Sequence, residues 1–186
     1  AQSGSIISSN LDRAADLVRG FKQVAVDQSS EEKRIFALAP YLEDVILSLR
    51  PKLKRLKHNI SIVGDQTIEV ESYPGAFSQI ATNFIMNSIM HAYDDEDEGK
   101  MVFEIHLDGR EVTVEYTDDG RGIPEENLAK IFEPFFTTKR GEGGSGLGMH
   151  IVYNLVTQKL GGSINCESKV GTGTKFTLKL PIANLK

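Results

Sequence analysis

The chain has 186 residues, which is enough for one ordinary domain with a short appendage. Its 40% hydrophobic and 25% charged residues are typical of a globular protein, and its net charge of −5 argues against a general nucleic-acid-binding protein. A single cysteine, Cys166, excludes an intramolecular disulfide. No apolar run approaches the ~20 residues that span a bilayer, and no signal peptide is visible, so we expect a cytoplasmic domain.

The first thirty residues are expected to form a helix and a linker. Residues 10–26 place Leu11, Ala14, Val18 and Phe21 on the three-four spacing of heptad positions a and d. Two heptads are too few for a coiled coil by themselves, so the helix either packs on its own domain or is half of a helical hairpin. The polar stretch that follows favours the hairpin. We therefore divide the chain into residues 1–30 and residues 31–186.

The next part of the chain predicts a short strand, a helix and a hairpin. The strand is Ile35–Leu38, and the helix runs from Pro40 to Leu49, where Pro51 ends it. The runs Ile60–Val63 and Ile68–Val70 alternate apolar and polar residues around a Gly-Asp turn signal, so we expect them to pair as a hairpin.

Pro74 opens a helix from Gly75 to about Tyr93. Asn83 and Asn87 are four residues apart, so they share one face of this helix. Two amides in an otherwise apolar helix are costly unless they are satisfied, which favours a ligand or metal role.

Two more hairpins and two more helices complete the chain. The hairpins pair Met101–Leu107 with Val112–Tyr116 and Ser163–Glu167 with Thr174–Leu180, while a short helix follows Pro124 and a longer one covers residues 147–160. The order predicts an α+β fold, a two-layer α/β sandwich with helices over one face of a mixed sheet.

Residues 118–148 carry the candidate chemistry. Asp118 follows a predicted strand, and a carboxylate there can accept a hydrogen bond from a ligand's amino group. Gly120 and Gly122 have no Cβ, so the backbone can pass close to a flat ring. The glycines of residues 141–148 precede a helix, whose first N–H groups suit phosphate. The stretch between the two glycine clusters predicts a lid.

The run from Gly141 to Gly146 also matches G-x-G-x-x-G, with Glu167 about twenty residues later. We reject a dinucleotide fold because the preceding residues do not form a buried strand and too little chain follows Glu167. No G-x-x-x-x-G-K-[ST] loop is present, which excludes P-loop chemistry.

Four motifs in order carry a family resemblance. The helix Gln79–His91 looks like an N box, Asp118–Gly122 like a G1 box, Phe132–Phe136 like an F box, and Gly144–Gly148 like a G2 box. Over residues 35–183 the chain resembles the ATP-binding domain of two-component sensor histidine kinases, in the superfamily of gyrase, Hsp90, histidine kinases and MutL with its Bergerat-type fold. The leading helix resembles the second helix of their dimerisation hairpin.

The resemblance implies a role for each motif. Asp118 would accept from the adenine amino group, Asn87 would hold Mg²⁺ through its side-chain oxygen, and Phe132, Phe135 and Phe136 would anchor the lid. The implied ATP-binding residues are Asn83, Asn87, His91, Asp118, Gly120, Gly122, Ile123, Phe136, Thr137, Lys139, Arg140, Gly144, Ser145, Gly146, Leu147, Gly148 and Thr174. Of these, the implied catalytic residues are Asn83, His91, Lys139 and Arg140.

Two departures from the family pattern refine the expectation. The ATPase branches place a water-activating Glu where this chain has Asn83, and a neutral amide is a poor general base, which favours transfer over hydrolysis. The four histidines precede Asn59, Ala92, Leu107 and Ile151, so none has the acidic neighbour of a phosphoacceptor. We expect the acceptor on an upstream helix, and this chain to bind ATP without autophosphorylation.

The resemblance also implies partners for the full protein. These are a response-regulator receiver domain and a second copy joined through the N-terminal hairpin, with no nucleic acid, and the full-length protein is compatible with an inner-membrane anchor. Three alternatives stay open: a free-standing ATPase or ATP-gated clamp, a non-catalytic nucleotide-binding module, and a Ser/Thr kinase of the same fold.

Overall fold

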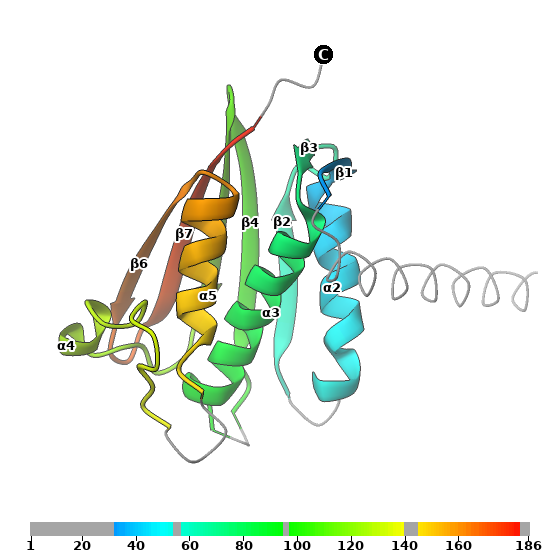
Figure 1. The fold of residues 1–186 in the computed structure, drawn as a ribbon. Helices are drawn as coiled ribbons and strands as arrows, with labels where there is room; N and C mark the ends of the chain where they lie inside the picture. The colour runs from blue at the N-terminus through cyan, green and yellow to red at the C-terminus, as the bar shows by residue number, and fades with distance from the viewer. Residues whose placement is uncertain (1–31, 54–56, 95–96, 140–144, 183–186) are drawn as a thin grey trace, which may run out of the picture.

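The structure is a computed structural model that describes residues 32–53, 57–94, 97–139 and 145–182 (Figure 1). The predicted leading helix, and with it the proposed domain of residues 1–30, lies outside the described residues. Within the described ranges, no helix combines the length and the apolar character that crossing a membrane requires.

A five-stranded mixed sheet forms one layer, in the order β2-β4-β5-β7-β6. β2 pairs in parallel with β4, and the other neighbours are antiparallel. The strands are β2 (Asn59–Gly64), β4 (Lys100–Asp108), β5 (Glu111–Asp118), β6 (Ser163–Lys169) and β7 (Gly173–Pro181). Both late hairpins, β4–β5 and β6–β7, are confirmed.

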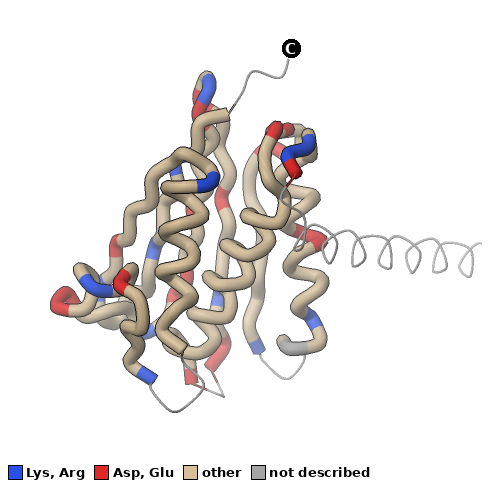
Figure 2. The backbone as a smooth tube through the Cα atoms, in the orientation of Figure 1, with Lys and Arg blue, Asp and Glu red and all other residues tan. Residues whose placement is uncertain are grey.

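Helices cover one face of this sheet (Figure 1). They are α2 (Leu38–Leu53), α3 (Pro74–His91) and α5 (Gly148–Asn154), the last continued by a π-helical turn η1 (Leu155–Lys159), and a short α4 (Glu125–Leu128) lies near β6. α3 contacts both α2 and α5 and carries no Lys, Arg, Asp or Glu (Figure 2). The predicted two-layer α/β sandwich is therefore confirmed.

The core lies between the two layers. Alternate residues of the central strands face the helices, so Met101, Phe103 and Ile105 of β4 are buried while their neighbours are partly exposed. Phe84 of α3 stacks between Tyr116 of β5 and Phe176 of β7, at ring-centroid distances of 5.1 and 4.7 Å. Such aromatic pairs fix α3 above the ends of β5 and β7.

The hairpin expected between Ile60–Val63 and Ile68–Val70 is wrong. β3 (Glu69–Ser72) pairs instead with β1 (Arg34–Ala37) in a separate two-stranded sheet, and β2 joins the main sheet beside β4. Between them the Asp65 carboxylate accepts hydrogen bonds from the backbone N–H and the hydroxyl of Thr67. This local turn redirects the chain without pairing the strands. Alternation identifies a strand but does not choose its partner.

Helix ends differ from the expectation by a few residues. α2 begins at Leu38 rather than Pro40 and passes through Pro51 to Leu53. Pro51 sits in the last turn, where its missing N–H removes one hydrogen bond from the end of the helix and does not split it.

The aromatic stack predicts a large effect of one core substitution. Phe84→Ala should lower the free energy of unfolding by about 3–5 kcal/mol, because it removes a side chain that is 1% exposed and leaves a cavity. Urea denaturation followed by circular dichroism measures this. The exposed helix residue Ile151 provides a control, whose Ala variant should change stability by about 0.5 kcal/mol. Equal effects of the two variants would contradict the packing argument.

Candidate functional site

A pocket of about 380 Å³ opens between α3, the ends of β5 and β7, and the segment 121–139. A second hollow of about 190 Å³ adjoins it, between α3 and the start of α5. Both are lined by Asn87, His91, Phe136, Thr137 and Met149, so they form two compartments of one site. We call them the Asp118 compartment and the amide compartment.

Asp118 is the last residue of β5 and is 3% exposed. Its Oδ1 accepts from the backbone N–H groups of Gly120 (3.1 Å) and Thr174 (3.2 Å), and its Oδ2 accepts from the Ser88 hydroxyl (2.7 Å). Three elements, α3, β5 and β7, thus hold one carboxylate. A carboxylate offers about four acceptor positions, so one stays available to a ligand in the pocket.

Burial raises the pKa of Asp118, and the hydrogen bonds from Ser88, Gly120 and Thr174 lower it in part. The adjacent Asp119 carboxylate adds a smaller upward effect. Burying an ionised carboxylate costs folding free energy, and the hydrogen bonds from Ser88, Gly120 and Thr174 stabilise the ionised form of Asp118.

Ser88 was not among the residues predicted for the site, yet its hydroxyl donates to Asp118 and accepts from the Tyr116 hydroxyl at 2.8 Å. The sequence does contain a feature that could have identified Ser88. Ser88 lies four residues after Phe84 on the apolar face of α3, where a hydroxyl needs a buried partner. The apolar lining residues Ile131 and Met149 were also missed, because their patterns do not differ from those of core residues.

The glycines of the first cluster serve close packing of the chain on itself. A Cβ at Gly120 would collide with Ala92 at the end of α3, and a Cβ at Gly122 would collide with the Lys169 carbonyl at the end of β6. Gly122 also has φ of +72°, which favours glycine, and it lines the pocket, whereas Gly120 does not. These contacts place the loop after Asp118 against α3 and β6.

The amide compartment is lined by Asn83 and Asn87 together with the residues that open α5. The Nδ2 atom of Asn83 is buried and has no hydrogen-bond partner among the described residues. A buried amide donor without an acceptor is costly, and an anionic oxygen in this compartment would satisfy it. A Cβ added at Gly148 would approach the Asn83 Oδ1 at 3.5 Å, so the start of α5 lies close to this amide.

His91 and Lys139 both line the Asp118 compartment. The His91 Nδ1 lies 3.1 Å from the Thr138 hydroxyl. Burial lowers the pKa of His91, and the nearby positive charges of Lys139 and Arg121 lower it further. His91 is therefore a neutral imidazole at pH 7, beside a cation that can meet a negative ligand.

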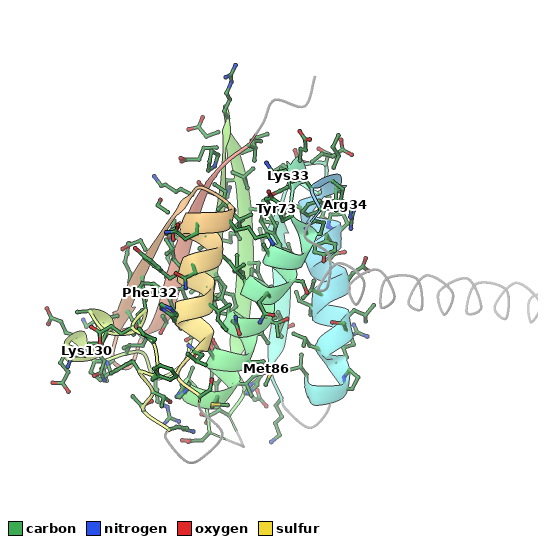
Figure 3. All side chains as sticks on the ribbon, in the orientation of Figure 1. Lys33, Arg34, Tyr73, Met86, Lys130 and Phe132 are labelled. Carbon is green, nitrogen blue, oxygen red and sulfur yellow. The ribbon has the colours of Figure 1, made fainter. Side chains whose placement is uncertain are left out.

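The segment over the pocket is anchored by two of the three expected phenylalanines. Phe132 lies beside α5 (Figure 3). Its ring packs against Tyr153 of α5 and Phe176 of β7, at centroid distances of 5.5 and 6.4 Å, and Phe136 lines both compartments. Phe135 is 63% exposed, so the expectation that it anchors the segment is wrong. Its φ of +65° turns the backbone at the point that Gly146 approaches.

The structure brings most of the predicted residues to the two compartments. Those that line them are Asn83, Asn87, His91, Asp118, Gly122, Ile123, Phe136, Thr137, Lys139, Ser145, Gly146, Gly148 and Thr174. Gly120 and Leu147 do not line either compartment, and Arg140 and Gly144 lie outside the described residues.

A carboxylate–histidine metal centre is not found in the pocket as described. Among the described residues the grouping of three such ligands is Glu104, His106 and Glu115, on β4 and β5. Asn87 lines both compartments, and its side-chain oxygen is of the type that a hard cation such as Mg²⁺ takes as a ligand.

Comparison with known proteins assigns the chain to a family. The family model described as "Histidine kinase-, DNA gyrase B-, and HSP90-like ATPase" matches residues 73–184, more than half of the chain. This range contains all four sequence motifs and every residue that lines the pocket.

Curated relatives resemble the chain over nearly its whole length. It is 35% identical to the sensor kinase CckA of Brucella abortus (strain 2308), covering 94% of this chain and 20% of that protein. It is 31% identical to the sensor protein TorS of Escherichia coli (strain K12), covering 96% of this chain and 18% of TorS. The chain thus spans about one fifth of the length of these relatives.

Solved structures agree with this assignment. The nucleotide-free catalytic domain of histidine kinase ThkA superposes with a TM-score of 0.71 at 27% identity, over 81% of this chain and 96% of that chain. ThkA in complex with the response regulator protein TrrA shares the fold, with a TM-score of 0.67 at 24% identity over 96% of this chain and 50% of that chain. The chain therefore belongs to the family of histidine kinase-, DNA gyrase B- and HSP90-like ATPases, and within it corresponds to the ATP-binding domain of a sensor histidine kinase.

Proposed function

We propose that the chain binds ATP with Mg²⁺ and, in the full protein, transfers the γ-phosphoryl group to a histidine on an upstream helix. The observation that carries the proposal is the buried Asp118 carboxylate, which keeps one acceptor position in a pocket that continues into the amide compartment. An amino-bearing ring and a polyphosphate are the two ends of one ATP molecule.

The two compartments suit the two ends of ATP. The adenine amino group would donate to Asp118, between the apolar side chains of Ile131 and Met149. The phosphates would lie in the amide compartment, where the Asn83 Nδ2, which has no partner among the described residues, provides a donor, and Lys139 of the adjoining Asp118 compartment provides charge. This assignment keeps the roles that the family resemblance implies for Asp118, Asn83 and Lys139.

Mg²⁺ would be held by the Asn87 side-chain oxygen, with phosphate oxygens and water as the other ligands. A bound Mg²⁺ neutralises part of the phosphate charge during transfer. Asn87 lines both compartments, so its amide would lie between the base and the phosphates of a bound ATP.

Transfer to a side chain is favoured over hydrolysis by Asn83. A neutral amide at the position of the ATPase general base cannot take a proton from water at pH 7. The chain would then contribute positioning and charge neutralisation, and the nucleophile would come from another part of the full protein.

Signalling partners follow from the same proposal. The solved complex of ThkA with the response regulator TrrA supports a response regulator receiver domain as the next acceptor, and the likeness to sensor kinases supports a homodimer joined through the N-terminal hairpin. A cytoplasmic position of this domain, with a membrane anchor elsewhere in the full protein, is compatible with these relatives.

Asp118→Asn should weaken ATP binding by about 1.5–3 kcal/mol, roughly 10- to 150-fold, because a hydrogen bond to a charged acceptor is lost. Isothermal titration calorimetry with ATP measures the effect. Asp119→Asn is a matched control, since the Asp119 carboxylate faces the Tyr93 hydroxyl and the Lys100 N–H and does not line the pocket. Unchanged ATP affinity in Asp118→Asn would refute the adenine assignment.

Asn87→Ala should abolish the gain in ATP affinity that Mg²⁺ gives to the unchanged chain, because the metal loses its protein ligand. Titrations of ATP with Mg²⁺ and with EDTA measure the gain, and circular dichroism checks the fold. Asn165→Ala, at an exposed position of β6, is the control. A full Mg²⁺ effect in Asn87→Ala would remove this residue from the metal site.

Incubation of the chain with γ-labelled ATP and Mg²⁺ should leave it unlabelled, since no histidine carries an acidic neighbour. His91 lies on α3 in the wall of the pocket, poorly placed for in-line attack on the γ-phosphorus. A longer chain that includes the upstream helix should acquire acid-labile label on that helix. Label on residues 1–186 alone that disappears in His91→Ala would overturn the proposed acceptor.

A further inference from the structure

A directed relay of hydrogen bonds ends on the pocket carboxylate. The Tyr116 hydroxyl donates to the Ser88 Oγ at 2.8 Å, and the Ser88 hydroxyl donates to the Asp118 Oδ2 at 2.7 Å. All three side chains are at most 3% exposed, so water does not compete for these bonds. The relay joins α3 to β5 at the floor of the Asp118 compartment.

The hydrogen bonds of the relay all point from Tyr116 towards Asp118, because the ionised Asp118 carboxylate can act only as an acceptor. An ionised Asp118 can only accept, so Ser88 must donate to it, and Ser88 then accepts from Tyr116. Two backbone N–H groups hold Oδ1 at the same time. The carboxylate cannot rotate without losing a bond, and the position that remains on it is an acceptor fixed in space.

A fixed acceptor discriminates between purines at carbon 6. A 6-amino group donates a hydrogen bond to it, whereas a 6-oxo group presents a second acceptor and leaves both oxygens unpaired. A 6-oxo purine could offer its N1–H instead, but the ring would have to shift, and a carboxylate held at three points cannot turn to follow.

We propose that Ser88, oriented by Tyr116, is a positioning residue that makes this site select 6-amino over 6-oxo purine nucleotides. The inference rests on the proposed nucleotide function and adds to it the origin of base selectivity. Ser88 acts by keeping Asp118 ionised and fixed, so its hydroxyl matters even though the neighbouring carboxylate makes the contact with the base.

Protonation of Asp118 would reverse the preference. A protonated carboxyl carries an O–H, which can donate to a 6-oxo group and is a poorer acceptor for an amine. Burial raises the pKa of Asp118 and the Ser88 bond opposes that rise, so removing the hydroxyl moves protonation to higher pH. Among the described residues, the titratable or charged groups around the pocket floor are His91 of α3, Tyr93 just after that helix, Tyr116 of β5, Asp119 and Arg121 of the loop after β5, Lys139 of the segment 121–139 and Cys166 of β6.

The test compares ATP with inosine triphosphate, which differs at carbon 6, by calorimetry on the chain as it stands. Ser88→Ala should lower ATP affinity by up to about tenfold, the scale of one hydrogen bond, and should lower the ATP-to-inosine-triphosphate affinity ratio by at least the same factor, because the affinity for inosine triphosphate should not fall. When the pH is lowered, the affinity ratio of this variant should begin to fall at a higher pH than that of the unchanged chain, because Asp118 becomes protonated earlier. Tyr116→Phe should act in the same direction with a smaller change, because Ser88 keeps its bond to Asp118 but loses the donor that orients it.

Ser78→Ala is the matched control, since Ser78 is a buried serine of the same helix, ten residues earlier, and lies outside the pocket. It should leave the affinity ratio unchanged. Thermal denaturation followed by circular dichroism confirms that each variant is folded.

An unchanged ratio in Ser88→Ala, which includes an equal loss of affinity for both nucleotides, would overturn the inference and leave ATP binding by the unchanged chain intact. If the unchanged chain binds neither nucleotide, the proposed function itself fails and the inference fails with it. These two failures are distinct, because the first appears only in the variants.

Discussion

The buried carboxylate of Asp118 is the constraint on which the rest of the site depends. Burial raises its pKa, so the folded chain holds a proton there more readily than the unfolded chain. Ionised Asp118 therefore lowers the free energy of unfolding. This effect is absent at a pH below the ordinary pKa of an aspartate and is fully present at a pH above the raised pKa of the folded chain. Donors from Ser88, Gly120 and Thr174 offset part of this cost.

Holding that carboxylate requires three elements to converge, and the packing of the core arranges them. Phe84 stacks on rings from β5 and β7, which sets the height of α3 above the two strands. One turn later, Ser88 then reaches the end of β5. Gly173 lets β7 approach the Asp118 carbonyl so closely that a Cβ would collide with it. The geometry of the pocket floor is thus a consequence of core packing at one end of the sheet.

Sequence reasoning succeeded where the signal was local and failed where it was not. The two late hairpins were predicted correctly because each has its turn residues next to its strands. The early hairpin was wrong, because β2 finds its partner in β4, more than thirty residues away, and nothing between them encodes this choice. Ser88 was missed for a related reason: its partners Tyr116 and Asp118 lie on a different element.

The sequence by itself determined the α+β class, the motifs of the site and most of the residue types that line the two compartments, because periodicity, turn residues and motif spacing are properties of short stretches. Tertiary structure decided which strands pair, that Phe135 is exposed, that Gly120 packs against Ala92, and that a Tyr-Ser-Asp relay closes the pocket floor. These features depend on contacts between segments that are far apart in the sequence. Such contacts are set by how the whole chain packs its apolar surface into one core, which short stretches do not encode.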